Sequence, residues 1–202
     1  PEHHVLGVGG ASMTLSGLML AEPVDLALDL GTGCGIQALH AARHAKRVIA
    51  TDISERALEL ARFNAALNGF ANIEFRLGSL FEPVAGERFG HVVSNPPFVI
   101  TPRIAGVPQY EYRDGGRAGD DLVASFVRGV GAVLAPGGLL VVAHATRTNL
   151  TRHPRPGPGH VLDDGELPRL IRGLDVLSSE EGWLESGRHE ARILARRPPA
   201  PP

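Results

Sequence analysis

The chain is organised around Leu28-Asp29-Leu30-Gly31-Thr32-Gly33-Cys34-Gly35, in which a hydrophobic run ends in an acid and is followed by three glycines at alternate positions. The apolar residues before the glycines predict a strand over 24–29, and the helical spacing after them predicts a helix over 35–46. Because glycine has no Cβ, the backbone between these elements can turn sharply and touch a ligand directly. The stretch therefore predicts a binding turn for a nucleotide-like cofactor, without identifying that cofactor.

Length and composition restrict the class of protein. The 202 residues suffice for one domain with a sizeable core, and an apolar fraction of 43% is ordinary for a globular protein. The formal net charge of -2 gives no overall attraction to nucleic acid or to an anionic membrane. Cys34 is the only cysteine, which excludes an internal disulfide and a cysteine-rich zinc site.

Targeting signals and domain limits give further expectations. No apolar run is long enough to span a bilayer and the N-terminus lacks a signal-peptide pattern, so we expect a cytoplasmic protein without membrane contact. We expect a single domain over 1–197 and a frayed tail over 198–202. Because the chain begins with Pro1 rather than methionine, we also expect upstream residues, which leave room for a missing recognition domain or partner subunit.

Strands and helices alternate along the chain. After the first unit, strands are predicted over 47–52, 73–77, 89–94, 139–143, 175–179 and 189–195. Helices are predicted over 56–67, 120–134 and 163–174, with a shorter helix within 1–21. Two segments without a clear period, 99–119 and 146–160, are expected to be loops. This alternation predicts a parallel α/β sheet that is covered on both faces and has an antiparallel end.

The spacing of the glycines argues against a nicotinamide cofactor. The dinucleotide fingerprint requires its third glycine at position 36, where this chain has Ile36. Asp52 ends the second predicted strand, where a carboxylate can accept hydrogen bonds from two ribose hydroxyls. The alternative is that Asp52 is a solvated acid at a strand end or a cap for the following helix.

A second motif, Asn95-Pro96-Pro97-Phe98, ends the fourth predicted strand. With these residues the chain resembles the class I S-adenosylmethionine-dependent methyltransferases, in the branch that methylates exocyclic amines of adenine or guanine and the glutamine side-chain amide. The match also includes Asp29 to Gly35, Asp52-Ile53-Ser54, Gly78-Ser79-Leu80-Phe81 and Leu134-Ala135-Pro136-Gly137-Gly138. The resemblance implies a Rossmann-like doubly wound sheet of seven strands, mostly parallel with an antiparallel last strand, and S-adenosyl-L-methionine as cofactor.

The chemistry of a planar nitrogen gives a reason for this motif. An amide or aromatic amine nitrogen is a poor nucleophile because its lone pair is delocalised. If the Asn95 side-chain oxygen and the Pro96 carbonyl accept its two hydrogens, the nitrogen can pyramidalise and direct its lone pair at a methyl group. Pro96 and Pro97 remove two N–H donors, so this backbone cannot continue a sheet, and Phe98 would stack on the flat target. The alternative is an ordinary turn that ends a strand.

The resemblance also assigns cofactor contacts. It implies that Asp29 meets the methionine amino group, that the backbone from Gly31 to Gly35 passes the methionine and ribose, and that Asp52 holds the ribose hydroxyls. Ser79 stands where the family usually has an acid beside the adenine, and its hydroxyl can still form a hydrogen bond there. The implied set is Asp29, Gly31, Thr32, Gly33, Cys34, Gly35, Asp52, Ile53, Gly78, Ser79, Leu80 and Asn95.

Histidines give no comparable signal. His40 and His44 share a face of the predicted helix at metal-like spacing but lack an acidic or cysteine partner, so we expect no metal site. Cys34 is expected to be a small packing residue within the turn.

The predicted function is an N-methyltransferase that acts on a planar nitrogen of a macromolecule, RNA, DNA or protein, rather than of a small molecule. Six loop arginines either contact phosphate or carry solvated charge: Arg103, Arg113, Arg117, Arg147, Arg152 and Arg155. Two alternatives stay open. One is a methyltransferase-like cofactor-binding subunit without activity of its own, and the other, less favoured, is a nicotinamide-dependent oxidoreductase.

Overall fold

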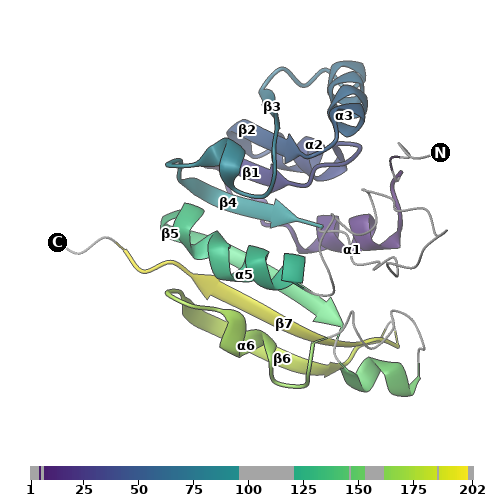
Figure 1. Ribbon diagram of the computed structural model, residues 1–202, viewed down its shortest axis with the longest axis vertical. Helices are drawn as coiled ribbons and strands as arrows, with labels where there is room; N and C mark the ends of the chain where they lie inside the picture. The colour runs from purple at the N-terminus through teal and green to yellow at the C-terminus, as the bar shows by residue number, and fades with distance from the viewer. Residues whose placement is uncertain are drawn as a thin grey trace, which may run out of the picture.

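The computed structural model describes residue 5 and residues 7–95, 121–145, 147–152, 162–185 and 187–199. Seven strands form one sheet in the order β3-β2-β1-β4-β5-β7-β6 (Figure 1). The strands are β1 (Val24–Leu30), β2 (Ala45–Asp52), β3 (Ile73–Leu77), β4 (Phe89–Ser94), β5 (Leu134–Ala145), β6 (Asp175–Trp183) and β7 (His189–Arg196). The helices are α1 (Gly10–Leu18), α2 (Ile36–Ala41), α3 (Glu55–Leu67), α5 (Asp121–Val133) and α6 (Leu167–Leu170), with 3-10 turns η1 (Glu82–Val84) and η2 (Arg147–Thr151).

Strand β7 runs against its neighbours, and the other pairs in the sheet are parallel. β1 pairs in parallel with β2 and β4, and the pairs β2–β3 and β4–β5 are also parallel. β7 pairs antiparallel with β5 on one side and β6 on the other. The predicted α/β fold is confirmed: a Rossmann-like doubly wound sheet of seven strands, mostly parallel with an antiparallel last strand.

The central strand β1 is buried on both faces of the sheet. Leu28 and Leu30 belong to an apolar cluster with Phe126 of α5, whereas Ala27 points to a second cluster with Ala38 of α2. Burial on both faces explains why this strand appears as a nearly continuous apolar run in the sequence. The second cluster is built mostly from alanine, which lets α2 lie close to the sheet. Among the described helices, none is both long and apolar enough to cross a membrane.

Helix α2 ends earlier than the sequence predicts. The expected helix covers 35–46, but α2 stops at Ala41 and β2 already begins at Ala45. The cause is a side chain from a distant segment, since Asn72 Nδ2 donates to the carbonyl oxygens of Ala42 and Ala45, each at 3.0 Å. These bonds satisfy carbonyls at the helix end, so the chain can leave the helix there and enter β2.

The segment after α5 is a strand where a helix end was expected. β5 begins at Leu134 rather than at residue 139. Phe89 of β4 pairs with Leu134 and His91 pairs with Leu139, so β5 bulges between these two pairs. The bulge accommodates Pro136, which cannot donate to a ladder, and Gly137, whose φ is +76°.

The helix predicted over 163–174 is wrong in length, because only the four residues of α6 are helical. Gly165 and Gly173 have φ angles of +73° and +69°, which an α-helix does not contain. Asp163, at the start of the predicted helix, forms an ion pair with Arg147.

Candidate cofactor and active site

The predicted site residues follow four neighbouring parallel strands. Strands β3, β2, β1 and β4 are adjacent in the sheet, so segments 78–80, 52–53 and 31–35 and Asn95 follow the carboxyl ends of consecutive strands. The strand order reverses at β1, which has β2 on one side and β4 on the other. In open α/β sheets, ligands bind at such a switch point.

Three glycines shape the turn after β1. Gly31, Gly33 and Gly35 have φ angles of +74°, +54° and +88°, a region that other residues rarely adopt. A Cβ at Gly31 or Gly33 would meet no atom within 4 Å, so bare main chain borders open space there. A Cβ at Gly35 would lie 3.0 Å from the Ala61 Cβ, so this glycine is needed for the packing of α3.

Asp29 is a buried carboxylate with one satisfied oxygen. The residue is 1% exposed, and the Thr32 hydroxyl donates a hydrogen bond to Oδ2. Oδ1 has no hydrogen-bond partner among the described residues. Burial raises the pKa of Asp29 to about 7, although the Thr32 hydroxyl and the Ala38 N–H lower it. Because an unpaired buried oxygen is unfavourable, Oδ1 is suited to accept a hydrogen bond from a ligand.

Asp52 connects the glycine turn with the start of α3. The Gly33 N–H donates to Oδ2 and the Ser54 N–H donates to Oδ1, both at 2.9 Å. Ser54 is the N-cap of α3 and accepts a hydrogen bond from the Ala57 N–H at 3.4 Å. The alternative role of Asp52 as the cap of this helix is taken by the Ser54 side chain, and Asp52 instead binds the N–H of that N-cap residue. It is only partly buried, so it is also accessible to a ligand.

The segment after β3 has an unusual backbone. Gly78 has a φ of +153°, and a Cβ there would lie 2.4 Å from the Pro83 Cγ. Leu80 has a φ of +46°, which is rare for a residue with a side chain and costs conformational energy. The Gly78 N–H donates to the Asp52 carbonyl at 3.0 Å, which fixes this segment beside the end of β2.

Asn95 directly follows β4 and is partly buried. The preceding Ser94 donates from Oγ to the Leu30 carbonyl at 2.7 Å, which ties the ends of β4 and β1 together. Pro96, Pro97 and Phe98 lie outside the described residues, as does the whole predicted loop 99–119 with Arg103, Arg113 and Arg117. The catalytic role of the four-residue motif stays a prediction.

The structure adds two polar residues that sequence reasoning missed. Gln37 in α2 is 3% exposed, and its Nε2 donates to the Ser12 carbonyl at 2.9 Å, which ties α1 to the helix that follows the glycine turn. Asn64 of α3 donates from Nδ2 to the Cys34 carbonyl at 2.8 Å and supports the turn from its other side. The buried Cys34 is a packing residue, as expected. For Gln37 and Asn64, the only signal in the sequence was a polar residue between apolar positions of a predicted helix.

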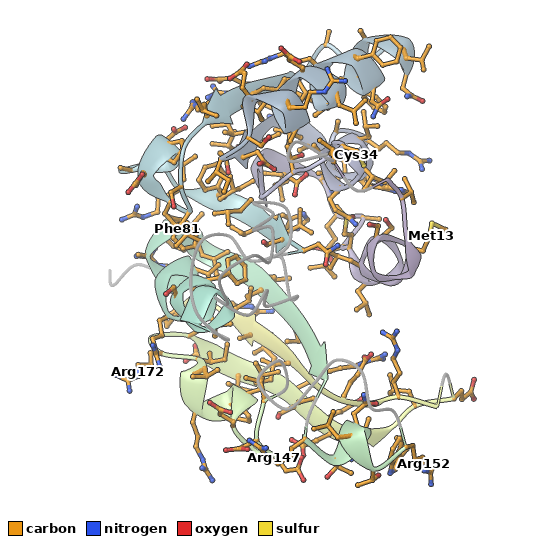
Figure 2. The ribbon with its side chains drawn as sticks, turned by 45° about the vertical axis from the view of Figure 1, so that its right-hand side comes forward. Met13, Cys34, Phe81, Arg147, Arg152 and Arg172 are labelled. Atoms are coloured by element: carbon orange, nitrogen blue, oxygen red, sulfur yellow. The ribbon has the colours of Figure 1, made fainter. Side chains whose placement is uncertain are left out.

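Two of the predicted loop arginines are described, and both contact neighbouring side chains. Arg147 pairs with Asp163, and the Arg152 guanidinium lies over the Trp183 ring at 4.0 Å from its centroid. Figure 2 shows Arg147 and Arg152 at the end of the molecule opposite Cys34. Arg155 lies outside the described residues.

The two histidines expected on one helix face do not share one. His40 belongs to α2, whereas His44 lies in the turn between α2 and β2. His44 and His91 line a mostly apolar pocket beneath α1. Burial lowers the pKa of His91, which keeps this ring neutral near pH 7.

Comparison with known proteins agrees with these observations. Residues 10–153 match the family model described as Methyltransferase small domain. The chain is 40% identical over 124 residues to a release factor glutamine methyltransferase of Xylella fastidiosa (strain 9a5c). The aligned segment covers 57% of this chain and 45% of that protein. The chain is 35% identical over 168 residues to a ribosomal protein uL3 glutamine methyltransferase of Bradyrhizobium diazoefficiens, covering 78% of this chain and 49% of that protein. The chain thus spans about half the length of the curated relatives it matches.

A solved structure shares the fold. The N-methyltransferase NodS from Bradyrhizobium japonicum WM9 superposes with a TM-score of 0.61 at 18% identity, covering 93% of this chain and 92% of that chain. The resemblance to methyltransferases that the motifs indicated is confirmed, since the family match includes the glycine turn, Asp52 and Asn95. The chain belongs to the methyltransferase small domain family.

Proposed function

We propose that this chain is the catalytic domain of an S-adenosylmethionine-dependent N-methyltransferase that acts on the side-chain amide of a glutamine in a protein. The observation that carries the proposal is the half-satisfied carboxylate of Asp29 at the switch point of the sheet, on the strand next to β4, which Asn95 follows. Both relatives described above are named for glutamine methylation, which favours an amide over a nucleobase amine. Their names refer to components of translation, which supports a protein partner and a cytoplasmic location.

The residues at the switch point fit the proposed cofactor. Asp29 Oδ1 would accept a hydrogen bond from the methionine ammonium group, and the open space beside Gly31 and Gly33 would take the adjoining atoms. Asp52 accepts two backbone hydrogen bonds and is partly buried, and its carboxylate would also accept from the ribose hydroxyls, because each carboxylate oxygen can accept more than one hydrogen bond. Gly78, Ser79 and Leu80 would border the adenine. When bound, the cofactor supplies a methyl group on a positively charged sulfur.

The acceptor nitrogen needs orientation rather than a strong base. Asn95 Oδ1 and the Pro96 carbonyl would accept its two hydrogens, which localises the lone pair on nitrogen. After methylation the nitrogen is acidic and releases a proton to solvent. Positioning and hydrogen bonding therefore provide the catalysis in this proposal.

Transfer of a radiolabelled methyl group tests the acceptor. We expect labelling of peptides with a central glutamine, and none when that glutamine is replaced by glutamate, which lacks the amide nitrogen. Labelling of RNA or DNA instead would overturn the choice of acceptor and retain the enzyme class. Tight cofactor binding by calorimetry without transfer to any of these acceptors would favour the silent subunit, and binding of NAD alone would favour an oxidoreductase.

The variant Asn95→Ala separates catalysis from binding. We expect transfer to fall by roughly 100-fold or more, because one of two acceptor groups is lost, while cofactor affinity measured by calorimetry changes little. Asn68→Ala is a matched control, since Asn68 is an exposed residue at the end of α3. Equal turnover of the Asn95→Ala and Asn68→Ala variants would remove Asn95 from the mechanism.

A further inference from the structure

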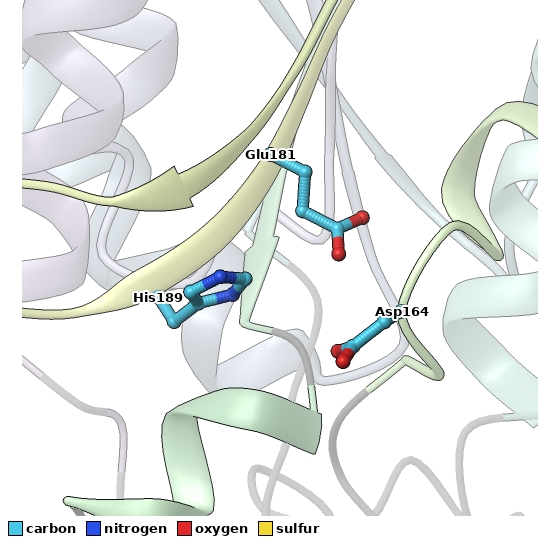
Figure 3. A group of neighbouring side chains, drawn as sticks. All are labelled: Asp164, Glu181 and His189. Carbon is cyan, nitrogen blue, oxygen red and sulfur yellow. The ribbon is translucent and has the colours of Figure 1, made fainter.

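Three potential metal ligands meet at the far end of the sheet. Asp164 lies in the turn before α6, Glu181 is near the end of β6 and His189 begins β7 (Figure 3). One possible ligand atom from each side chain lies within 4.8 Å of the other two. These residues are separated in sequence and belong to no motif, and none of them is part of the proposed cofactor site.

The hairpin of β6 and β7 determines where two of the ligands lie. Glu181 pairs with Ala191 in the register of this hairpin, and Trp183 pairs with His189. Side chains of alternate residues share a face of a strand, so positions 181, 183, 189 and 191 belong to one face of the hairpin. The third ligand, Asp164, reaches this face from the turn before α6.

Neighbouring groups orient each of the three residues. The Thr148 hydroxyl and N–H both donate to the Asp164 carboxylate. The Gly165 N–H donates to Glu181 Oε2 at 2.9 Å. The His189 N–H donates to Oδ1 of Asn149, a residue that is 2% exposed, and this bond fixes the start of β7. The site is thus supported by contacts to a buried side chain and to two turns.

The His189 ring is also oriented by an aromatic neighbour. Its centroid lies 5.2 Å from that of Trp183, and the two rings are nearly perpendicular at 79°. The Trp183 ring is itself held by Arg152, whose guanidinium lies over it. A ring fixed in this way loses less side-chain freedom when its nitrogen binds an ion.

Two carboxylates and one imidazole suit a divalent transition metal. Zinc binds His nitrogen and carboxylate oxygen at about 2.0–2.2 Å, so ligand atoms around it lie about 3.3 Å apart. The three ligand atoms lie within 4.8 Å of one another, so they would have to approach by at most about 1.5 Å. Asp164 and Glu181 are exposed, so their side chains can make this movement, with adjustment of the hydrogen bonds from Thr148 and Gly165.

We propose that Asp164, Glu181 and His189 form a site for a divalent transition-metal ion of the zinc type, with water completing the coordination. The ion joins the turn before α6 to both strands of the closing hairpin. The site lies at the same edge of the sheet as the carboxyl end of β5, because Ala145 pairs with Glu190 at the start of β7. This proposal departs from the expectation of no metal, and it is independent of the proposed methyl transfer.

Trp183 provides a specific reporter for this site, because it is the only tryptophan in the chain. We would titrate the untagged protein with zinc chloride, and in parallel with manganese and magnesium chloride, and follow tryptophan fluorescence together with calorimetry. We expect one zinc ion per chain, binding in the micromolar range with a change in fluorescence, weaker binding of manganese and little of magnesium.

Three variants and one control test the ligands. Asp164→Asn, Glu181→Gln and His189→Gln should each weaken zinc binding at least tenfold, whereas Glu180→Gln, the neighbouring position on the opposite face of β6, should not. Zinc should also raise the thermal midpoint of the wild-type chain but not of the three variants, whose metal-free midpoints show that they are folded. Equal zinc affinity of the ligand variants and the control, or no binding below millimolar zinc, would overturn the site and leave the methyltransferase proposal untouched.

Discussion

The two halves of the sheet use different means to form a polar site. In the half made of β3, β2, β1 and β4, backbone turns with positive φ angles place main-chain groups around Asp29 and Asp52. In the half made of β5, β7 and β6, side chains from distant positions converge, as Asp164 and His189 do. A site made from backbone conformation depends on glycines at positive φ, where any other residue is strained. A site made from side chains depends on contacts that can be removed one at a time.

The largest expected effect follows from a glycine of the first half. In Gly78→Ala the new Cβ would overlap the ring of Pro83, at 2.4 Å, and the φ of +153° would be strained. We expect the variant to lose about 3 kcal/mol of unfolding free energy, together with cofactor binding. Urea titration measures the first effect and calorimetry the second.

Gly86→Ala is the control for this substitution. Gly86 also has a positive φ, of +84°, but a Cβ there would meet no atom within 4 Å. Gly86→Ala should lower the unfolding free energy by about 1 kcal/mol, from backbone strain alone. Equal losses in the two variants would mean that the contact with Pro83 contributes nothing.

Asp29→Asn is expected to affect binding and stability in opposite directions. Cofactor affinity should fall by roughly 10- to 100-fold, because a charge-assisted hydrogen bond is lost. The folded carboxyl has a pKa of about 7 against an ordinary value of 3.8, so the folded state holds its proton more tightly than the unfolded state. In the cofactor-free wild type, stability from this group is therefore lost as pH rises from about 4 to about 7, and the asparagine variant should lack that loss.

Asp25→Asn serves as the matched control on the same strand. Asp25 is exposed and pairs with Lys46, which lowers the pKa of the carboxyl. This variant should retain the wild-type cofactor affinity and the pH dependence of stability between pH 4 and 7. Chemical denaturation at a series of pH values distinguishes the two aspartates.

Cofactor affinity itself should depend on pH through Asp29. Binding of an ammonium group favours the ionised carboxylate, so lowering the pH through the pKa of about 7 weakens binding. We expect affinity to be roughly eightfold higher at pH 7.5 than at pH 6, which is the ratio of the ionised fractions of a group with this pKa. Calorimetry at both pH values checks this ratio, and a flat profile in the wild type would mean that Asp29 does not meet the ammonium group.

The smallest expected effect belongs to the second half. Arg152→Ala removes the cation from the Trp183 ring, and an exposed contact of this kind contributes about 0.5–1 kcal/mol. Tryptophan fluorescence should change while cofactor affinity does not. Loss of cofactor affinity in this variant would show that the two halves of the sheet are coupled rather than independent.

The same contrast explains what the sequence could predict. Glycines at alternate positions after an apolar run, and an asparagine before two prolines, are local patterns, and they identified the turn after β1 and the end of β4. Asn72 ends α2 from 30 residues away, and Gln37 ties α2 to α1 through the Ser12 carbonyl. Such contacts depend on which segments fold next to one another, so no local sequence pattern indicated them.

The three residues of the proposed metal site were not predicted from the sequence for the same reason. Asp164, Glu181 and His189 are brought together only by the register of β6 with β7 and by a turn that a longer helix was expected to replace. Prediction of this site would have required the correct end of the segment before α6. The available signal in that segment was Gly165, which has a positive φ.

The contact between Asp52 and Gly33 also bears on how fast and how tightly a ligand can bind. The turn after β1 is held in shape by this hydrogen bond and by the bonds from Gly31 and Thr32 to the Thr51 carbonyl. Ordering a residue costs about 1–2 kcal/mol in conformational entropy, and bonds within the chain place that cost on folding rather than on association. In the proposed function, the glycine turn would thus be preorganised for its ligand.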